Sequence, residues 1–303
     1  MAAGQPDGHD GAPVSYRART EGGDIFAPFL TRWDLVADGN PFATHSSRLL
    51  PVRQGTTSAM LKIALEPEEQ AGCAVMDWWS GRGAAPVLAY DPSGVLLMER
   101  AEGTRSLARF ARSGRDEDAT RILCGAVAKL HGHCLGPSAG GLSRLPRPQN
   151  LVPLDIWFQD LAPIARTQGG ILGECQRVAD RILPVQRDIV VLHGDIHHDN
   201  VLDFEARGWL AIDPKRLIGE RAFDYANIFC NPDPDWDIET APRLFHQRLE
   251  IAAAETGLER RWLVSWIMAW AGLSAAWFIG DNQPGAVDLA IAELAAAELA
   301  RLS

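Results

Sequence analysis

An uncharged segment of nineteen residues at 262–280, WLVSWIMAWAGLSAAWFIG, constrains the fold more than any other part of the sequence. A segment of this length and apolarity must be buried, either in a bilayer or in a protein core. Its tryptophans at 262, 266 and 270 recur every four residues and share one helical face, whereas membrane tryptophans gather at the two interfaces. We therefore predict a buried core helix in a cytoplasmic protein that does not associate with membranes.

The charge and the cysteines narrow the class of protein further. The formal net charge is −10, and no run of Lys or Arg forms a local basic patch. Such a surface repels nucleic acid and anionic membranes and would favour a cationic small molecule, with simple solubility as the alternative explanation of the charge. The five cysteines are widely spaced and contain no C-x-x-C pair, which argues against a disulfide framework or a zinc ribbon and fits a reducing cytoplasm.

The N-terminal third is predicted to form a small sheet. Residues 1–24 are rich in glycine, proline and charge and are interpreted as a flexible leader. From residue 25 to residue 100, short β-prone runs alternate with turn signals. The predicted strands are 33–38, 47–53, 58–64, 86–91 and 95–100. One helix is predicted at 68–79, because acids occupy its first turn and its apolar residues have helical spacing.

Beyond residue 103 the pattern becomes helical. Helices are predicted at 116–134, 153–167, 172–183, 221–230, 241–256, 259–280 and 284–302, and short strands at 189–195, 200–204 and 208–214. The sequence thus predicts an α+β fold with two lobes in a chain of 303 residues. The N-terminal lobe, 25–100, is a small antiparallel sheet with one helix, and the C-terminal lobe, 101–303, is larger and helical.

The densest cluster of reactive side chains is HGDIHHDN at 193–200, which is followed by Asp213 in the run WLAIDP. Two acids and an Asn at the ends of short strands offer the oxygen ligands that Mg²⁺ prefers. Phosphoryl transfer uses an Asp five residues before an Asn: the Asp orients and deprotonates the attacking hydroxyl, and the Asn and a later Asp hold metal. His193, Asp195, Asn200 and Asp213 fit this arrangement together.

These residues resemble the signature of the protein-kinase-like small-molecule kinases, H-x-D-x-x-x-x-N followed by a strand with a metal-binding Asp. Within that group the chain is most similar to the aminoglycoside phosphotransferases, and more narrowly to the streptomycin 6-kinases and hydroxyurea kinases, at 193–202, 208–229 and 271–277. The resemblance implies a protein-kinase-like two-lobe fold. It also implies a kinase that uses ATP and Mg²⁺ and confers antibiotic resistance by phosphorylating a cationic aminoglycoside such as streptomycin. Hydroxyurea or a metabolic alcohol is the alternative acceptor.

The same resemblance suggests roles for individual residues. Asp195 would be the catalytic base, and Asn200 and Asp213 would hold the metal ions that bridge the ATP phosphates. His193 and Asp224 would support the catalytic loop without contacting substrate.

For the nucleotide, the resemblance points to Lys62 as the lysine that grips the phosphates, with Glu69 as its partner on the following helix. The interval between them is short for the group, so Glu66 and Glu68 are alternatives.

The hinge that would bind adenine through main-chain groups falls at 98–101, which includes Glu99 and Ala101. The turn at 53–58 falls where the group has its phosphate-covering loop, although it lacks a G-x-G-x-x-G pattern.

Acidic side chains could bind a cationic acceptor. The acid-rich loop 231–239 is one source, and Asp155, Asp160 and Asp281 are others. A solvated surface is the alternative interpretation of each.

Two further classes of protein are alternatives to a kinase. The run from Asp195 through His197, His198 and Asp199 resembles the Asp and His ligand sets of dinuclear phosphoesterases, which would make the protein a metallohydrolase. A catalytically silent kinase-like binding protein is the other alternative.

Overall fold

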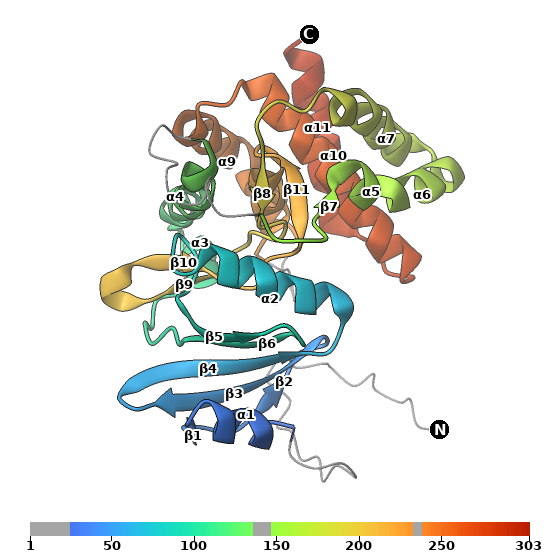
Figure 1. The fold of residues 1–303 in the computed structure, drawn as a ribbon. Coiled ribbons are helices and arrows are strands. Elements are labelled where there is room, and N and C mark those ends of the chain that lie inside the picture. Colours follow the sequence, from blue (N-terminus) through green and yellow to red (C-terminus); the bar gives the residue numbers. More distant parts are fainter. Residues whose placement is uncertain (1–24, 136–146, 233–237) are drawn as a thin grey trace, which may run out of the picture.

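The computed structural model of the chain describes residues 25–135, 147–232 and 238–303. An antiparallel sheet, here called the N-terminal sheet, lies below a larger group of helices, here called the helical body (Figure 1). The predicted α+β architecture with a sheet-rich and a helix-rich part is confirmed. The predicted leader, 1–24, lies outside the described residues.

The N-terminal sheet has the strand order β1-β3-β4-β6-β5, with β2 also paired to β3, at Arg48 and Leu49, and all its pairs are antiparallel. Its strands are β1 (Val36–Ala37), β2 (Phe42–Ala43), β3 (Ser47–Gln54), β4 (Thr57–Ala64), β5 (Val87–Asp91) and β6 (Val95–Glu99). The register places Lys62 on the central strand β4, opposite Leu49 of β3 and Leu96 of β6.

Both faces of this sheet are covered. Leu61 and Leu97 belong to a small core that includes Phe26, next to helix α1 (Ala27–Arg32), whereas Leu96 and Met98 belong to the main core with helix α2 (Pro67–Trp79). Burial on both faces explains why the strand VLLME has no alternation of polar and apolar residues.

Helix α1 differs from the sequence prediction. A strand was expected at 33–38, but only Val36 and Ala37 pair with β3, and the chain before them is helical. Pro28 in the first turn favours a helix start, because proline fixes a helical φ and needs no hydrogen-bond donor there.

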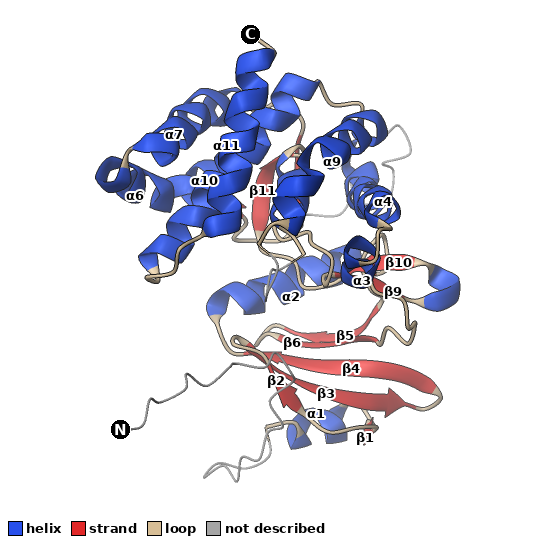
Figure 2. Ribbon diagram, turned by 180° about the vertical axis from the view of Figure 1, so that it is seen from behind, coloured by secondary structure: helices blue, strands red, loops and turns tan. Residues whose placement is uncertain are grey.

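The helical body contains two small sheets, of which one lies among the helices and the other lies at the side that faces the N-terminal sheet (Figure 2). Its helices are α3 (Leu107–Arg112), α4 (Asp116–Leu135), α5 (Leu154–Trp157), α6 (Leu161–Gln168), α7 (Gly170–Ile182), α8 (Phe223–Ala226), α9 (Thr240–Thr256), α10 (Arg260–Gly280) and α11 (Ala286–Arg301), with a 3₁₀ turn η5 (Asn227–Cys230) after α8. One small sheet pairs β9 (Val201–Asp203) with β10 (Trp209–Ala211). The other places β11 (Leu217–Glu220) between β7 (Val152–Pro153) and β8 (Ile189–Leu192).

Helix α10 contains the uncharged segment. It is long and apolar enough to cross a membrane, but it packs against α6, α7, α8, α9 and α11. Trp262, Trp266 and Trp270 are all buried. Helix α7 approaches so closely at Gly272 that a Cβ there would lie 2.3 Å from the Cβ of Cys175. The prediction of a buried core helix is confirmed.

An ion pair with no solvent access joins α4 to α9. The guanidinium of Arg248, 0 % exposed, binds the carboxylate of Asp116 with Nη2 at 2.6 Å, and its Nη1 donates to the carbonyl oxygen of Ile228 at 2.8 Å. A buried charge pair of this kind is costly to break, because the remaining partner loses its compensation.

Asp116→Asn keeps the shape of the side chain and removes its charge, so we expect the free energy of unfolding to fall by about 3–5 kcal/mol in denaturant titrations. Glu255→Gln is the matched control, since it breaks the exposed pair Arg121–Glu255 between the same two helices. The free energy of unfolding of that variant should fall by less than about 1 kcal/mol. Equal decreases in the two variants would contradict the stabilising role of the Asp116–Arg248 pair.

Candidate active site

The loop at 193–200 connects β8 to β9 and is held by Asp224 of α8. The Asp224 carboxylate accepts hydrogen bonds from the main-chain N–H groups of His193, at 2.9 Å, and Gly194, at 2.7 Å. His131 of α4 lies 2.8 Å from the same carboxylate through Nε2. Because Asp224 is buried, these three contacts replace the water that its charge would otherwise need.

The His193 ring is a structural part of this loop. Its Nε2 lies 2.8 Å from the carbonyl oxygen of Ile212, which can only accept, so Nε2 carries the proton. Its Nδ1 then accepts from the main-chain N–H of Asp195 at 3.2 Å. Burial lowers the pKa of His193 and so favours this neutral form. With both nitrogens engaged, His193 has no free ligand atom for a metal.

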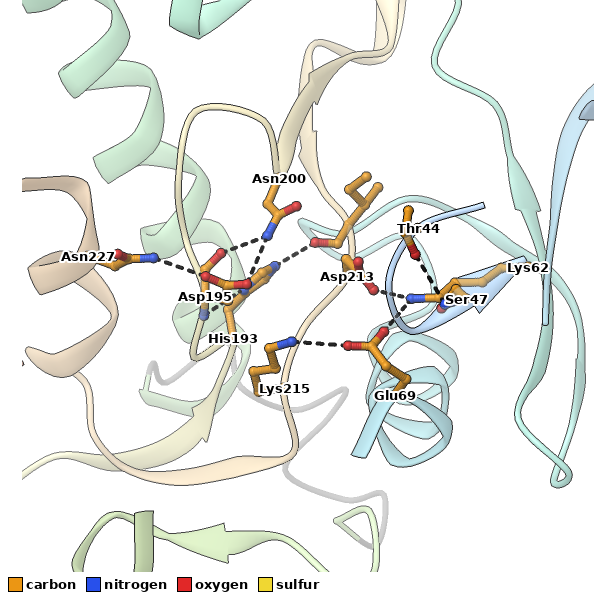
Figure 3. A network of polar contacts seen from close by, with 11 residues as sticks. Thr44, Ser47, Lys62, Glu69, His193, Asp195, Asn200, Asp213, Lys215 and Asn227 are labelled. Carbon is orange, nitrogen blue, oxygen red and sulfur yellow. Dashed lines mark hydrogen bonds and ion pairs between the residues drawn. The ribbon is translucent and has the colours of Figure 1, made fainter. Parts of the chain in front are cut away.

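Two amide side chains orient the Asp195 carboxylate. Asn227 Nδ2 donates to Oδ1 at 3.0 Å, and Asn200 Nδ2 donates to the main-chain oxygen of Asp195 at 3.0 Å and lies 3.4 Å from Oδ2 (Figure 3). Asn227 in turn accepts a hydrogen bond from Trp270 Nε1 at 3.1 Å. Sequence reasoning missed Asn227 and Trp270, because nothing in their local sequence links them to the loop.

Asp213 follows β10 with φ at +62°, in the left-handed region that non-glycine residues rarely adopt. Hydrogen bonds on both sides hold it there. The N–H of Ile212 donates to the carbonyl oxygen of Asn200 at 2.9 Å. The N–H of Lys215 donates to the carbonyl oxygen of His193 at 2.7 Å. Backbone strain of this kind is typical of functional residues.

A charge cluster, buried at Lys62 and Glu69, joins the sheet to this loop. Lys62 of β4 contacts Glu69 of α2 at 2.8 Å and also contacts Asp213, and Lys215 contacts the other oxygen of Glu69 at 3.0 Å (Figure 3). The partner of Lys62 is therefore Glu69, whereas Glu66 is exposed and Glu68 only half-buried.

The pKa values follow from these neighbours. Burial alone would raise the pKa of Glu69, but Lys62 and then Lys215 outweigh it and lower the pKa to about 2. Burial alone would lower the pKa of Lys62, but Asp213 and then Glu69 outweigh it and raise it. Burial is likewise outweighed at Lys215, where Asp195 and then Glu69 raise the pKa. Lys215 was also missed by sequence reasoning, although it lies only two residues after Asp213.

A cavity of about 310 Å³, here called the nucleotide cavity after the role predicted for its residues, lies between the N-terminal sheet and the helical body. Apolar residues line one end of it, including Met98 and Leu202, together with Glu99 and Ala101 of the predicted hinge. The N–H of Glu99 is already bonded to the carbonyl oxygen of Pro86 at 2.9 Å, and its carboxylate pairs with Arg207. Lys62, Asn200 and Asp213 line the same cavity. The lining of this cavity thus combines apolar side chains with a lysine, an amide and a carboxylate.

The prediction for the phosphate-covering turn is wrong. The turn at 53–58 joins β3 to β4 near the hinge, since Ala59 pairs with Glu99. Thr44 and Ser47, which join β2 to β3, instead line the cavity together with Lys62. The Thr44 hydroxyl accepts from the main-chain N–H of Ser47 at 3.1 Å, which shapes this turn (Figure 3).

Asp195 lines a second cavity, of about 580 Å³, which is here called the acceptor cavity. Its wall combines carboxylates with aromatic rings: Asp195, Asp281, Asp288, Trp157, Trp270, Trp277 and Phe278. Of the other acids predicted from sequence, Asp160 accepts from Trp277 Nε1 at 3.1 Å, and Asp155 is exposed and not part of the lining. Residues 233–237 of the acid-rich loop lie outside the described residues.

Asn200 and Asp213 suit Mg²⁺. Asn200 turns its Nδ2 toward Asp195, which leaves its amide oxygen as an acceptor at the nucleotide cavity, and the Asp213 side chain is 41 % exposed there. Mg²⁺ commonly takes one or two protein oxygens and completes its shell with phosphates and water. In the parts of the chain that the structure describes, no three His, Cys, Asp or Glu residues form a metal cluster, so the metallohydrolase alternative gains no support.

Solved structures place the fold among the protein-kinase-like phosphotransferases. A choline kinase from Cryptosporidium parvum matches with a TM-score of 0.58 at 13% identity, covering 88% of this chain and 90% of that one. A thermostable mutant of the aminoglycoside phosphotransferase APH(4)-Ia, in a ternary complex with AMP-PNP and hygromycin B, matches with a TM-score of 0.56 at 16% identity, covering 90% and 98%. At identities this low, the two matches show only that the fold is shared.

The sequence shows the family within this class. The family model for aminoglycoside/hydroxyurea antibiotic resistance kinases matches residues 32–282, and the chain belongs to that family. It is 48% identical over 273 residues to a streptomycin 3''-kinase of Klebsiella pneumoniae, covering 88% of this chain and 98% of that one. It is 32% identical over 289 residues to a streptomycin 6-kinase of Streptomyces glaucescens, covering 86% and 85%. The protein is a kinase, and the roles of its individual residues stay predictions.

Glu69 should stabilise the fold only while it is ionised. Its pKa of about 2 lies below the ordinary 4.5, so its contribution is complete above the ordinary value and is lost as the pH falls toward 2. The free energy of unfolding should be larger for the wild type than for Glu69→Gln, and this difference should shrink by about 1 kcal/mol between pH 6 and pH 4. Denaturant titrations at both pH values measure this, with Glu68→Gln as the control on the same helix. Parallel pH dependences of wild type and Glu69→Gln would refute it.

Proposed function

We propose that the protein transfers the γ-phosphoryl group of ATP, with Mg²⁺, to a hydroxyl of streptomycin or a closely related aminoglycoside, and so confers resistance in the cytoplasm. The observation that carries the proposal is that the hydrogen-bonded pair of Asp195 and Asn200 connects the two cavities. Asp195 lines the acceptor cavity, and its hydrogen-bond partner Asn200 lines the nucleotide cavity with Asp213. We assign nucleotide binding to the N-terminal lobe, 25–100, and the catalytic loop and acceptor binding to 101–303.

In this reaction Asp195 orients the acceptor hydroxyl and takes its proton. Asn227 donates to Oδ1 of the carboxylate at 3.0 Å and Asn200 lies 3.4 Å from Oδ2, so two amides fix the carboxylate in the wall of the acceptor cavity. The acceptor oxygen forms a bond to the γ-phosphorus while the bond to the β,γ-bridging oxygen breaks and ADP leaves. Mg²⁺, held by Asn200 and Asp213, would neutralise phosphate charge. Lys62 would bind the phosphates once it is released from Asp213.

A cationic acceptor is supported by the electrostatics of the acceptor cavity. Asp281 is exposed to solvent and Asp288 is buried, so the lining of the cavity includes both an exposed and a buried carboxylate. The rings of Trp157 and Trp277 contact each other at 5.4 Å between centroids and present aromatic surface, which also attracts cations. The net charge of −10 adds a favourable long-range field.

For the hydroxyl that is phosphorylated, we favour the 3'' position. The support is the 48% identity to a streptomycin 3''-kinase, against 32% to a streptomycin 6-kinase. The sequence resemblance alone pointed to position 6, which is the competing assignment.

Streptomycin should stimulate Mg²⁺-dependent ADP release from ATP, and the drug should gain the mass of one phosphate. Phosphorus–proton coupling in the NMR spectrum of the product distinguishes position 3'' from position 6. Asp195→Asn should lower kcat at least about 100-fold, because the variant cannot accept the proton. Asp199→Asn, an exposed residue of the same loop, is the matched control and should keep its activity.

Other aminoglycosides, hydroxyurea and simple alcohols complete the acceptor panel. Turnover with hydroxyurea but not with streptomycin would identify hydroxyurea, the alternative acceptor, as the substrate. Nucleotide binding without turnover on any acceptor would indicate a silent binding protein.

Asp281→Asn should raise KM for streptomycin about three- to tenfold with little change in kcat, because it removes one exposed charge at the cavity rim. Steady-state kinetics at low salt and at 0.5 M NaCl measure the effect, which should shrink to about twofold or less at the higher ionic strength. An unchanged KM at low salt would remove Asp281 from acceptor binding.

A further inference from the structure

Lys215 is a cation in a cavity that otherwise offers carboxylates. It is the one Lys or Arg among the described residues that line the acceptor cavity, where Asp195, Asp281 and Asp288 also lie. A cationic acceptor gains nothing from a lysine in its binding site, since like charges repel. The charge of Lys215 therefore points to an anion that enters the same space.

The chain uses lysine sparingly. It has three lysines against 26 arginines. Two of them, Lys62 and Lys215, bind opposite oxygens of Glu69, and the third, Lys129, is exposed on α4. An ammonium is a compact point charge, whereas a guanidinium is a broad fork. Two of the three lysines thus contact a single carboxylate of the site.

Lys215 lines the acceptor cavity and is connected through Glu69 to Lys62, which lines the nucleotide cavity. Its main-chain N–H donates to the carbonyl oxygen of His193 at 2.7 Å, which holds it against the catalytic loop. Its ammonium is 3.0 Å from Glu69 Oε1, between α2 and that loop (Figure 3). A phosphoryl group that passes from the nucleotide cavity, at Asp213, to the acceptor cavity, at Asp195, crosses this region.

We propose that Lys215 is a catalytic residue that contacts the phosphoryl group during transfer and stabilises the charge on its equatorial oxygens. This proposal rests on the function proposed above. The bond to the bridging oxygen of ADP breaks, the bond to the acceptor oxygen forms, and Asp195 takes the acceptor proton. Lys215 exchanges neither bond nor proton and acts by charge alone, as cations do around a loose phosphoryl transition state. Holding Glu69 in place is the competing, purely structural role.

The test compares Lys215→Met, which removes the charge, with Lys215→Arg, which keeps it, and with Lys129→Met as the matched control. We expect kcat of Lys215→Met to fall at least about 100-fold, with KM for ATP and streptomycin within about threefold of wild type. Lys215→Arg should recover part of kcat, and Lys129→Met should match wild type. Thermal unfolding reports any folding defect, and Lys215→Gln replaces Lys215→Met if the latter does not fold.

A binding measurement separates catalysis from structure. ADP with aluminium fluoride imitates the planar phosphoryl group, and calorimetry gives its affinity with and without acceptor. Lys215→Met should weaken binding of this complex by about the factor lost in kcat while leaving the affinity for ADP alone unchanged. Equal weakening of both ligands, or an unchanged kcat, would overturn the proposal and leave the structural role. If wild type does not phosphorylate streptomycin, the proposed function fails, but the measurement without acceptor still decides the role of Lys215.

Discussion

The carboxylate of Glu69 joins the three parts of the chain that form the site. One oxygen binds Lys62 of the N-terminal sheet at 2.8 Å, and the other binds Lys215 of the loop after β10 at 3.0 Å. Helix α2, which carries Glu69, packs so closely on that loop that a Cβ at Gly72 would lie 2.3 Å from the carbonyl oxygen of Pro214. The contact between α2 and this loop therefore combines a carboxylate that is paired on both sides with a glycine that allows the close approach.

The parts that sequence could predict are those that depend on local spacing. The loop from His193 to Asn200 is eight residues long, and its strands, its turn and its reactive side chains are contiguous. Helix α10 could be predicted because nineteen uncharged residues at 262–280 must be buried wherever they lie. The pairing of Lys62 with Glu69 could also be predicted, because the two positions are seven residues apart on consecutive elements.

The parts that sequence could not predict depend on register and on distant contacts. The turn that closes the nucleotide cavity is 44–47 and not 53–58, because Lys62 pairs opposite Leu49, at the β2 end of β3. Asn227 reaches Asp195 across 32 positions of sequence, and only the packing of η5 against the catalytic loop brings them together. No periodicity in a single sequence encodes such a contact.

The uncharged helix α10 connects the stability of the fold to its chemistry. One part of it packs on α7 at Gly272, whereas Trp270 and Trp277 line the acceptor cavity. Trp270 also donates to Asn227, which holds Asp195, so a core residue orients the proposed base through a single intermediate. A charged side chain at position 270 would lack compensation in the core and would act directly on the Asp195 carboxylate. The absence of charge along 262–280 thus serves both the packing of the helical body and the electrostatics of phosphoryl transfer.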